Sequence, residues 1–230
     1  MRWIALFLGL AALLAAVLWQ VSRAREYQFF GEIVTRGEGS AQVVALTFDD
    51  GPTAAHTGAL LEGLGEARAT FFLVAQDIVA NPEAAEAIVA AGHEIGNHSW
   101  DHPRMVLMSP AAVRAQVEDM DAAIRALGYH GAIPFRPPFG KKLFVLPWVL
   151  SQMGRPSVMW SMEPDTVLGA ELSAEDLTAY VVEGAEAGDI ILLHGMFSGN
   201  AATREALPGI VAGLAARGFG FVTVSEILGE

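Results

Sequence analysis

Two adjacent carboxylates end an apolar stretch in the amino-terminal third of the sequence. Asp49 and Asp50 follow the strand-like run 43–46 within the segment TFDDGP, and Gly51 and Pro52 interrupt any further strand because proline has no N–H for a sheet. Neighbouring carboxylates repel each other, and a divalent cation relieves the repulsion. The pair therefore suggests one acid that binds a metal and one that faces a water beside it. The alternative is a turn that caps a helix.

A pair of histidines adds nitrogen ligands to this hypothesis. His98 and His102 lie four residues apart, a spacing that places both imidazoles on one face of a helical turn. Two histidines and one carboxylate, with one position left for water, form the ligand set typical of catalytic zinc. We interpret three other histidines, His56, His93 and His130, as surface or core residues.

Three more segments end an apolar run with polar or charged residues. They are Arg136 before Pro137 and Pro138, Glu163 and Asp165 after the run 157–159, and His194 after the run 190–193. In α/β barrels, active sites are built where the carboxyl ends of the strands converge. We therefore expect these segments to meet the aspartates and histidines at one site. The alternatives are a surface ion pair for Arg136 and a capped strand end for His194.

These segments together make the chain resemble the polysaccharide deacetylase family, the NodB-homology domain of carbohydrate esterase family four. The five motifs of the family occur in order, as TFDDGP, HSWDH, RPPFG, the WSMEPD region and LLH, within about residues 43–227. The resemblance implies a distorted, incomplete (β/α) barrel. It also implies hydrolytic removal of N-acetyl groups from GlcNAc-containing polymers, or of O-acetyl groups from xylan.

The resemblance implies a role for each matching residue. It assigns the metal ligands to Asp50, His98 and His102, the general base to Asp49, the partner of the base to Arg136, and the general acid to His194. The expected cofactor is one divalent ion, most often zinc. Substrate contacts are expected from Leu192, as a wall of the acetyl-methyl pocket, and from the backbone N–H of Phe139 just after Pro138, which would hold the oxyanion.

The fourth motif departs from the family pattern, in which an aspartate that orients the acid histidine is followed by a tryptophan. Here the sequence from Glu163 reads EPDTV, and no tryptophan follows. Asp165 is the nearest candidate to orient His194, and Glu163 is the second. The spacing alone does not choose between them.

Alternating elements support the same fold. Seven strand-like runs lie near residues 42–48, 69–74, 93–97, 133–136, 157–161, 189–193 and 219–224. Helix-like stretches alternate with them near residues 57–65, 82–91, 109–127, 143–153, 173–187 and 201–217. This alternation predicts an α/β domain with about seven parallel strands, over residues 42–230, preceded by a short linker and entry segment at 26–41. Ser109 and Ser173 are expected to cap two of the helices.

The first 25 residues predict a membrane anchor. Residues 3–19 contain no charged or strongly polar side chain, and a helix over them would be about 26 Å long, close to the ~30 Å hydrocarbon core of a bilayer. Trp3 and Trp19 stand at its two ends, where interfacial aromatics belong. The alternative is a cleaved signal peptide and a secreted protein. The bulky residues 18–21 after the small ones favour an uncleaved signal anchor, with the catalytic domain outside a bacterial cytoplasm.

Composition narrows the choice of partners. The chain has 14 basic and 26 acidic residues and a net charge of −12, which disfavours binding to nucleic acid and suits a neutral or partly cationic glycan. The absence of cysteine excludes disulfides and thiolate metal ligands. An N-deacetylase is the favoured function. The alternatives are an O-acetyl esterase on a xylan-like polysaccharide and an inactive glycan-binding domain.

Overall fold

Largely buried parallel strands form the centre of the molecule, of which the computed structural model describes residues 2–39, 41–169 and 173–229. The main sheet has the order β4-β3-β2-β6, and β7 pairs with the first residues of β2. These strands are β2 (Val43–Asp49), β3 (Ala69–Leu73), β4 (Glu94–Asn97), β6 (Ile190–His194) and β7 (Gly220–Phe221). Burial along the length of β3 and β4 is typical of a parallel sheet that is covered on both faces.

Shorter pairings continue this sheet into a distorted, incomplete barrel. β1 (Ile33–Val34), in the segment expected as a linker, pairs in parallel with β5 (Ser157–Val158). Single parallel bridges join Asn97 to Phe135, Phe135 to Ser157, and Met162 to Ile191. One side of the ring therefore has continuous ladders, and the other has one two-residue ladder and isolated bridges. The strand expected at 133–136 is reduced to one bridged residue, because prolines at 134, 137 and 138 cannot donate to a ladder.

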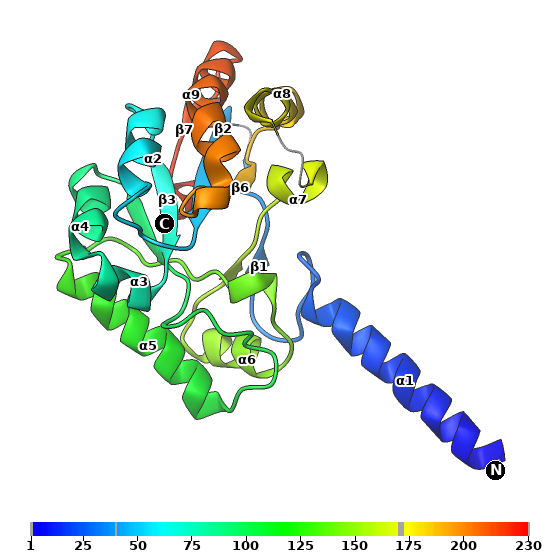
Figure 1. Ribbon diagram of the computed structural model, residues 1–230. Coiled ribbons are helices and arrows are strands. Elements are labelled where there is room, and N and C mark those ends of the chain that lie inside the picture. Colours follow the sequence, from blue (N-terminus) through cyan, green and yellow to red (C-terminus); the bar gives the residue numbers. More distant parts are fainter. Residues whose placement is uncertain (1, 40, 170–172, 230) are drawn as a thin grey trace.

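Helices surround the strands (Figure 1). They are α2 (Thr57–Leu64), α3 (Ala75–Ala80), α4 (Pro82–Ala90), α5 (Pro110–Ala126), α6 (Val145–Gln152), α7 (Pro164–Leu168), α8 (Ala174–Gly184), α9 (Ala201–Ala216) and α10 (Val224–Leu228). The six expected helices are all present. The short elements β1, α3, α7 and α10 were not predicted, because so few residues show no clear periodicity. Ser109 and Ser173 accept the backbone N–H groups of Ala112 and Asp176, so both expected caps are confirmed.

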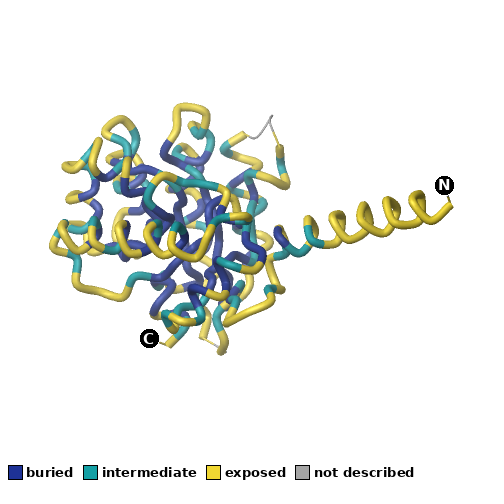
Figure 2. The backbone as a smooth tube through the Cα atoms, turned by 90° about the horizontal axis from the view of Figure 1, so that it is seen from below, coloured by how far each residue is buried: buried dark blue, intermediate teal, exposed yellow. Residues whose placement is uncertain are grey.

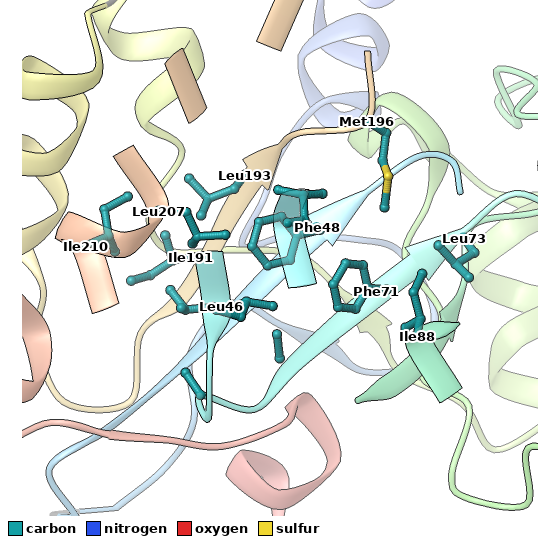
Figure 3. Packing of buried hydrophobic residues seen from close by; sticks show 14 of the residues in the cluster. Leu46, Phe48, Phe71, Leu73, Ile88, Ile191, Leu193, Met196, Leu207 and Ile210 are labelled. Atoms are coloured by element: carbon teal, nitrogen blue, oxygen red, sulfur yellow. The ribbon is translucent and has the colours of Figure 1, made fainter. Parts of the chain in front are cut away.

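Alternation along the strands divides the core into an outer and an inner part. Leu46 and Phe48 of β2 face the covering helices, where they pack with residues of β3, β6 and α9 (Figure 3). Ala45 belongs instead to the inner cluster, together with Phe72 and Leu192. Because side chains alternate along a strand, Thr47 and Asp49 share the inner face with Ala45. The sheet therefore directs the first aspartate of the motif into the barrel.

The amino-terminal helix α1 (Arg2–Ser22) projects away from this body and is exposed over nearly all of its length (Figures 1 and 2). In the described part of the chain, it is the one helix that is long and apolar enough to cross a membrane. Its last turn is attached to the body. Ser22 is buried, its carbonyl accepts the N–H of Lys142 at 2.9 Å, and the ammonium of Lys141 lies 4.4 Å from the Trp19 ring centroid.

Candidate active site

The carboxyl ends of three strands bring most of the expected site residues together. Asp49 ends β2 and is the register partner of His194, which ends β6. His98 follows the last residue of β4. The backbone at Asp50 adopts a positive φ of 73°, a left-handed conformation that is uncommon outside glycine. Such strain is maintained at functional sites when the surrounding structure holds it in place.

Asp50, His98 and His102 form a compact set of three donors, and their ligand atoms all lie within 4.8 Å of one another. The Nε2 atoms of the two histidines are 3.2 Å apart, and Asp50 Oδ1 is 3.3 Å from His102 Nε2 and 3.9 Å from His98 Nε2. Tetrahedral coordination with metal–ligand bonds of about 2.0–2.1 Å requires donors separated by about 3.3 Å. The set is therefore close to the spacing that a divalent metal requires.

Neighbouring groups act on the two histidines of this donor set. His98 Nδ1 lies 2.9 Å from the carbonyl oxygen of Arg136, which can only accept, so this nitrogen carries the proton and Nε2 presents its lone pair to the site. Burial and the nearby His98 lower the pKa of His102, although Asp50 and Asp49 act in the opposite direction. Both rings therefore match the chemistry of a metal site.

The expected helical turn between His98 and His102 is wrong. The two residues lie in a loop after β4, in which Ser99 and His102 have positive φ values of 75° and 56°. The side-chain oxygen of Ser99 accepts the N–H of His102 at 3.0 Å and closes the bend. The rings meet because the loop folds back, so the four-residue spacing is right although its structural explanation is not.

Arg136 holds Asp49 inside the barrel. Its Nη1 donates to Asp49 Oδ1 at 2.6 Å and to the side-chain oxygen of Thr47 at 2.8 Å, and the guanidinium carbon lies 4.0 Å from the Phe72 ring centroid. Both charged groups are buried. Burial alone would raise the pKa of Asp49, but the charge and hydrogen bond of Arg136 together with the charges of His98 and His194 leave the pKa below its ordinary value. Asp49 is therefore ionised at neutral pH.

Asp165 lies directly behind His194. Its Oδ2 is 3.0 Å from both the Nδ1 and the backbone nitrogen of His194. Burial lowers the pKa of His194, but the hydrogen bond to Asp165 and the charges of the neighbouring aspartates raise it to about 9. The second candidate, Glu163, instead accepts hydrogen bonds from Trp160 Nε1 at 3.0 Å and from the Thr166 hydroxyl at 2.7 Å. The geometry thus places Asp165, rather than Glu163, where it can orient His194.

A cavity of about 370 Å³ opens onto these groups. It is lined by Asp49, Asp50, His98, His102, Phe139, Gly140, Trp160, Glu163, Leu192 and His194. Phe139 has a φ of 57°, and its ring centroid lies 4.4 Å from that of His102. The preceding residue, Pro138, is buried and does not line the cavity. Every expected site residue other than Pro138, Arg136 and Asp165 therefore reaches the cavity. Arg136 and Asp165 lie behind it.

The wall formed by Trp160 was not predicted. In the family pattern a tryptophan follows the acidic residues of the fourth motif, whereas Trp160 precedes them. It could have been found because it directly follows the apolar run 157–159, which is the same kind of strand-end position as that of the other site residues.

Comparison with known proteins agrees with this geometry. Residues 36–158 match the family model described as polysaccharide deacetylase. The chain is 33% identical to the peptidoglycan-N-acetylglucosamine deacetylase PgdA of Listeria monocytogenes over 81% of its own length, but it spans 39% of the length of that relative. It is 31% identical to a peptidoglycan-N-acetylglucosamine deacetylase of Bacillus cereus, with coverage of 89% of this chain and 96% of the relative.

A solved structure gives the same result. The Bc1960 peptidoglycan N-acetylglucosamine deacetylase, in complex with 4-naphthalen-1-yl-N-oxidanyl-benzamide, superposes with a TM-score of 0.76 at 30% identity and covers 85% of this chain and 92% of that one. The chain therefore belongs to the polysaccharide deacetylase family, the NodB-homology proteins of carbohydrate esterase family four.

Proposed function

We propose that the protein is a metal-dependent deacetylase that hydrolyses N-acetyl groups of GlcNAc-containing glycans of the peptidoglycan or chitin type. The observation that carries this proposal is the convergence of an ionised aspartate, a protonated histidine and an Asp–His–His donor set on one cavity. We further propose that α1 anchors the protein in a bacterial membrane with the catalytic domain outside the cytoplasm, where such polymers lie.

The base in this proposal is Asp49. Its Oδ2 lies 3.6 Å from His98 Nε2, so the carboxylate faces the donor set while its other oxygen is held by Arg136. A water in the cavity would lose its proton to Asp49 as it attacks the acetyl carbonyl carbon. Arg136 keeps the carboxylate ionised and fixes its direction.

The acid in this proposal is His194. Its Nδ1 is held by Asp165, so Nε2 is the atom that would deliver a proton to the leaving nitrogen. An amine leaves poorly without that proton, and the raised pKa keeps His194 protonated at neutral pH. The protonated ring therefore favours amide cleavage in particular.

The remaining wall would bind the acetyl group. Leu192 and Trp160 offer apolar surface for the methyl group. The backbone N–H of Phe139 would stabilise the oxyanion. A divalent cation held by Asp50, His98 and His102, most often zinc, would polarise the carbonyl and acidify the water when bound.

The decisive experiment is acetate release from a substrate panel. Chitooligosaccharides, peptidoglycan and acetylxylan would be incubated with the full-length protein in detergent. Release from the first two well above release from acetylxylan is the expected result. The reverse order would establish the O-acetyl esterase alternative, and no release from any substrate by metal-loaded protein would establish the inactive alternative.

The donor set has its own test. Asp50→Ala should abolish binding of one equivalent of zinc, because it removes one of the three protein ligands. Metal content after dialysis measures this directly. The matched control is Asp119→Ala, which removes an exposed carboxylate on α5 and should leave the metal content unchanged. Equal zinc content in the two variants would show that the metal, if any, is held elsewhere.

A further inference from the structure

Exposed aromatic side chains gather where α1 joins the body. Tyr27, Phe29, Phe30, Phe144 and Trp148 are each between 38% and 51% exposed. Phe29 stacks on Phe144 with ring centroids 4.6 Å apart, and Tyr27 meets Phe29 edge-on at 5.5 Å. Trp148 of α6 lies one helical turn after Phe144, which directly precedes this helix, and its backbone N–H donates to the carbonyl of Phe144 at 3.1 Å. These residues thus come from two segments that pack against each other.

Basic residues border the aromatic ones. The only two lysines of the chain are Lys141 and Lys142, and both contact the end of α1: Lys141 through the Trp19 ring, and Lys142 through the Ser22 carbonyl. Burial and the nearby charges of Arg23 and Arg104 lower the pKa of Lys141, so three cations crowd at this point. The chain as a whole has a net charge of −12, so this cluster is opposite in sign to the total charge.

We propose that these five aromatic residues, with Arg23, Arg104 and Lys141, form a surface that rests on the interface of an anionic bilayer; we name it the rim surface. The proposal rests on the proposed anchor role of α1. Tyrosine and tryptophan favour the headgroup level of a membrane, and basic side chains near the bilayer are attracted to anionic lipids. The bilayer is the favoured occupant because the rim surface is continuous with the end of the apolar helix.

The rim surface also borders the catalytic cavity. Gly140, which lines the cavity, directly precedes Lys141, and the Arg104 guanidinium lies 4.7 Å from the ring centroid of Phe139. Arg25 Nη1, just after α1, is 3.9 Å from a carboxylate oxygen of Glu163 in the cavity wall. Docking of the rim surface would hold the cavity beside the membrane. The substrate would therefore be glycan that lies next to the lipid surface rather than polymer far from it.

Spin labels at single cysteines test this proposal, and the chain has no native cysteine to replace. The full-length protein would be reconstituted in vesicles of phosphatidylethanolamine and phosphatidylglycerol. Nitroxide labels would be placed by Phe30→Cys and Trp148→Cys on the rim surface, by Leu10→Cys in α1, and by Ala215→Cys on α9. The last is the matched control, since α9 lies across the body from α6 (Figure 1). Collision with lipid-soluble oxygen and with a water-soluble nickel complex reports the surroundings of each label.

The expected result is preferential oxygen collision for the labels at positions 30 and 148 as well as 10, with the label at 215 in water. If the labels at positions 30 and 148 are as exposed to water as the control while the label at position 10 is in lipid, the docking proposal is overturned and the anchor proposal stands. Water exposure at position 10 would overturn the anchor and the docking together. Rim labels that lose nickel collisions only when chitooligosaccharide is added would reassign the rim surface to glycan binding. Acetate release by each labelled protein shows separately whether the deacetylase proposal stands.

Discussion

Asp49 and Arg136 form an ion pair whose two charges are both buried. Such a pair is stable only when the remaining donors are satisfied, and Arg136 also donates to the side-chain oxygen of Thr47 and to the backbone carbonyl of Met159. These acceptors allow the charge of Asp49 to be changed while the arginine keeps partners. The proposed base role of Asp49 can therefore be tested without leaving Arg136 without hydrogen-bond partners.

Asp49→Asn should retain the metal and lower the deacetylation rate by a factor of at least ~100, the usual loss for a general base. The side chain keeps its shape but can no longer accept the proton of water. Steady-state acetate release and metal content would be measured together. Unfolding should begin at a lower temperature, because Arg136 loses its counter-charge. Turnover near that of the unchanged protein would assign the base to another residue.

The raised pKa of His194 predicts how the deacetylation rate depends on pH. Its pKa of about 9 means that the acid is protonated below that pH and is lost as the pH rises through it. Asp165→Asn removes the hydrogen-bonded carboxylate, so the pKa should fall toward the ordinary value of about 6.5. The alkaline limit of the pH–rate profile should move down for an N-acetyl substrate, and much less for an activated acetate ester. A bound cation affects the unchanged protein and the Asp165→Asn variant alike, so the readout is the difference between their alkaline limits.

The matched control for this change is Glu163→Gln, which alters a carboxylate that bonds to Trp160 and Thr166 instead. It should leave the alkaline limit in place. A shift in this variant and none in Asp165→Asn would reverse the assignment.

At the scale of elements, β4 shows how tightly the strands position the site. A Cβ atom added to Gly96 would lie 2.4 Å from Phe72 Cδ1, and the Phe72 ring in turn supports the guanidinium of Arg136. The close approach of β4 to β3 therefore determines where Arg136, the partner of Asp49, can lie.

Gly96→Ala should destabilise the protein by about 1–3 kcal/mol, the usual cost of overpacking, and should lower activity because Phe72 must move. Gly58→Ala on α2 is the control. Outside its chain neighbours and the backbone of α2 itself, no described atom lies within 4 Å of its added Cβ, so it should stabilise the helix by about 0.5–1 kcal/mol. Urea unfolding measures both. Equal stability of the two variants would show that β4 can shift away from Phe72.

The long elements and the motif residues could be predicted from the sequence, whereas features that depend on loop conformation or on contacts between distant segments could not. Long buried strands and amphipathic helices follow from periodicity, and the donors of the metal set lie in short motifs that the sequence displays directly. The loop that joins His98 to His102 depends on positive φ values at Ser99 and His102, which residue type does not reveal. The Trp160 wall and the single-residue bridge at Phe135 depend on how distant segments meet.

At the scale of the whole molecule, the proposed anchor role of α1 predicts where the protein lies in the cell. Residues 3–21 should remain attached as an anchor, because residues 18–21 are too bulky for a cleavage site of the usual small-residue type. Mass spectrometry of protein extracted from membranes should detect the intact amino-terminal segment. A mature chain that begins between residues 20 and 30 would instead establish a secreted enzyme, and would remove the end of α1 from the rim surface.

The difference between the two sides of the barrel, continuous ladders on one and mainly isolated bridges on the other, affects how activity is lost on heating. Arg136 crosses the barrel interior from Asp49 on β2 to the carbonyls of Val158 and Met159, on the side where one two-residue ladder and isolated bridges replace continuous ladders. Its side chain thus connects the two walls of the barrel. Partial opening of the wall with isolated bridges requires less free energy than global unfolding. Such opening would break the contacts of Arg136 and leave the Asp49 carboxylate without its partner. Thermal inactivation would then precede melting, and cooling would restore activity without refolding of the ladders.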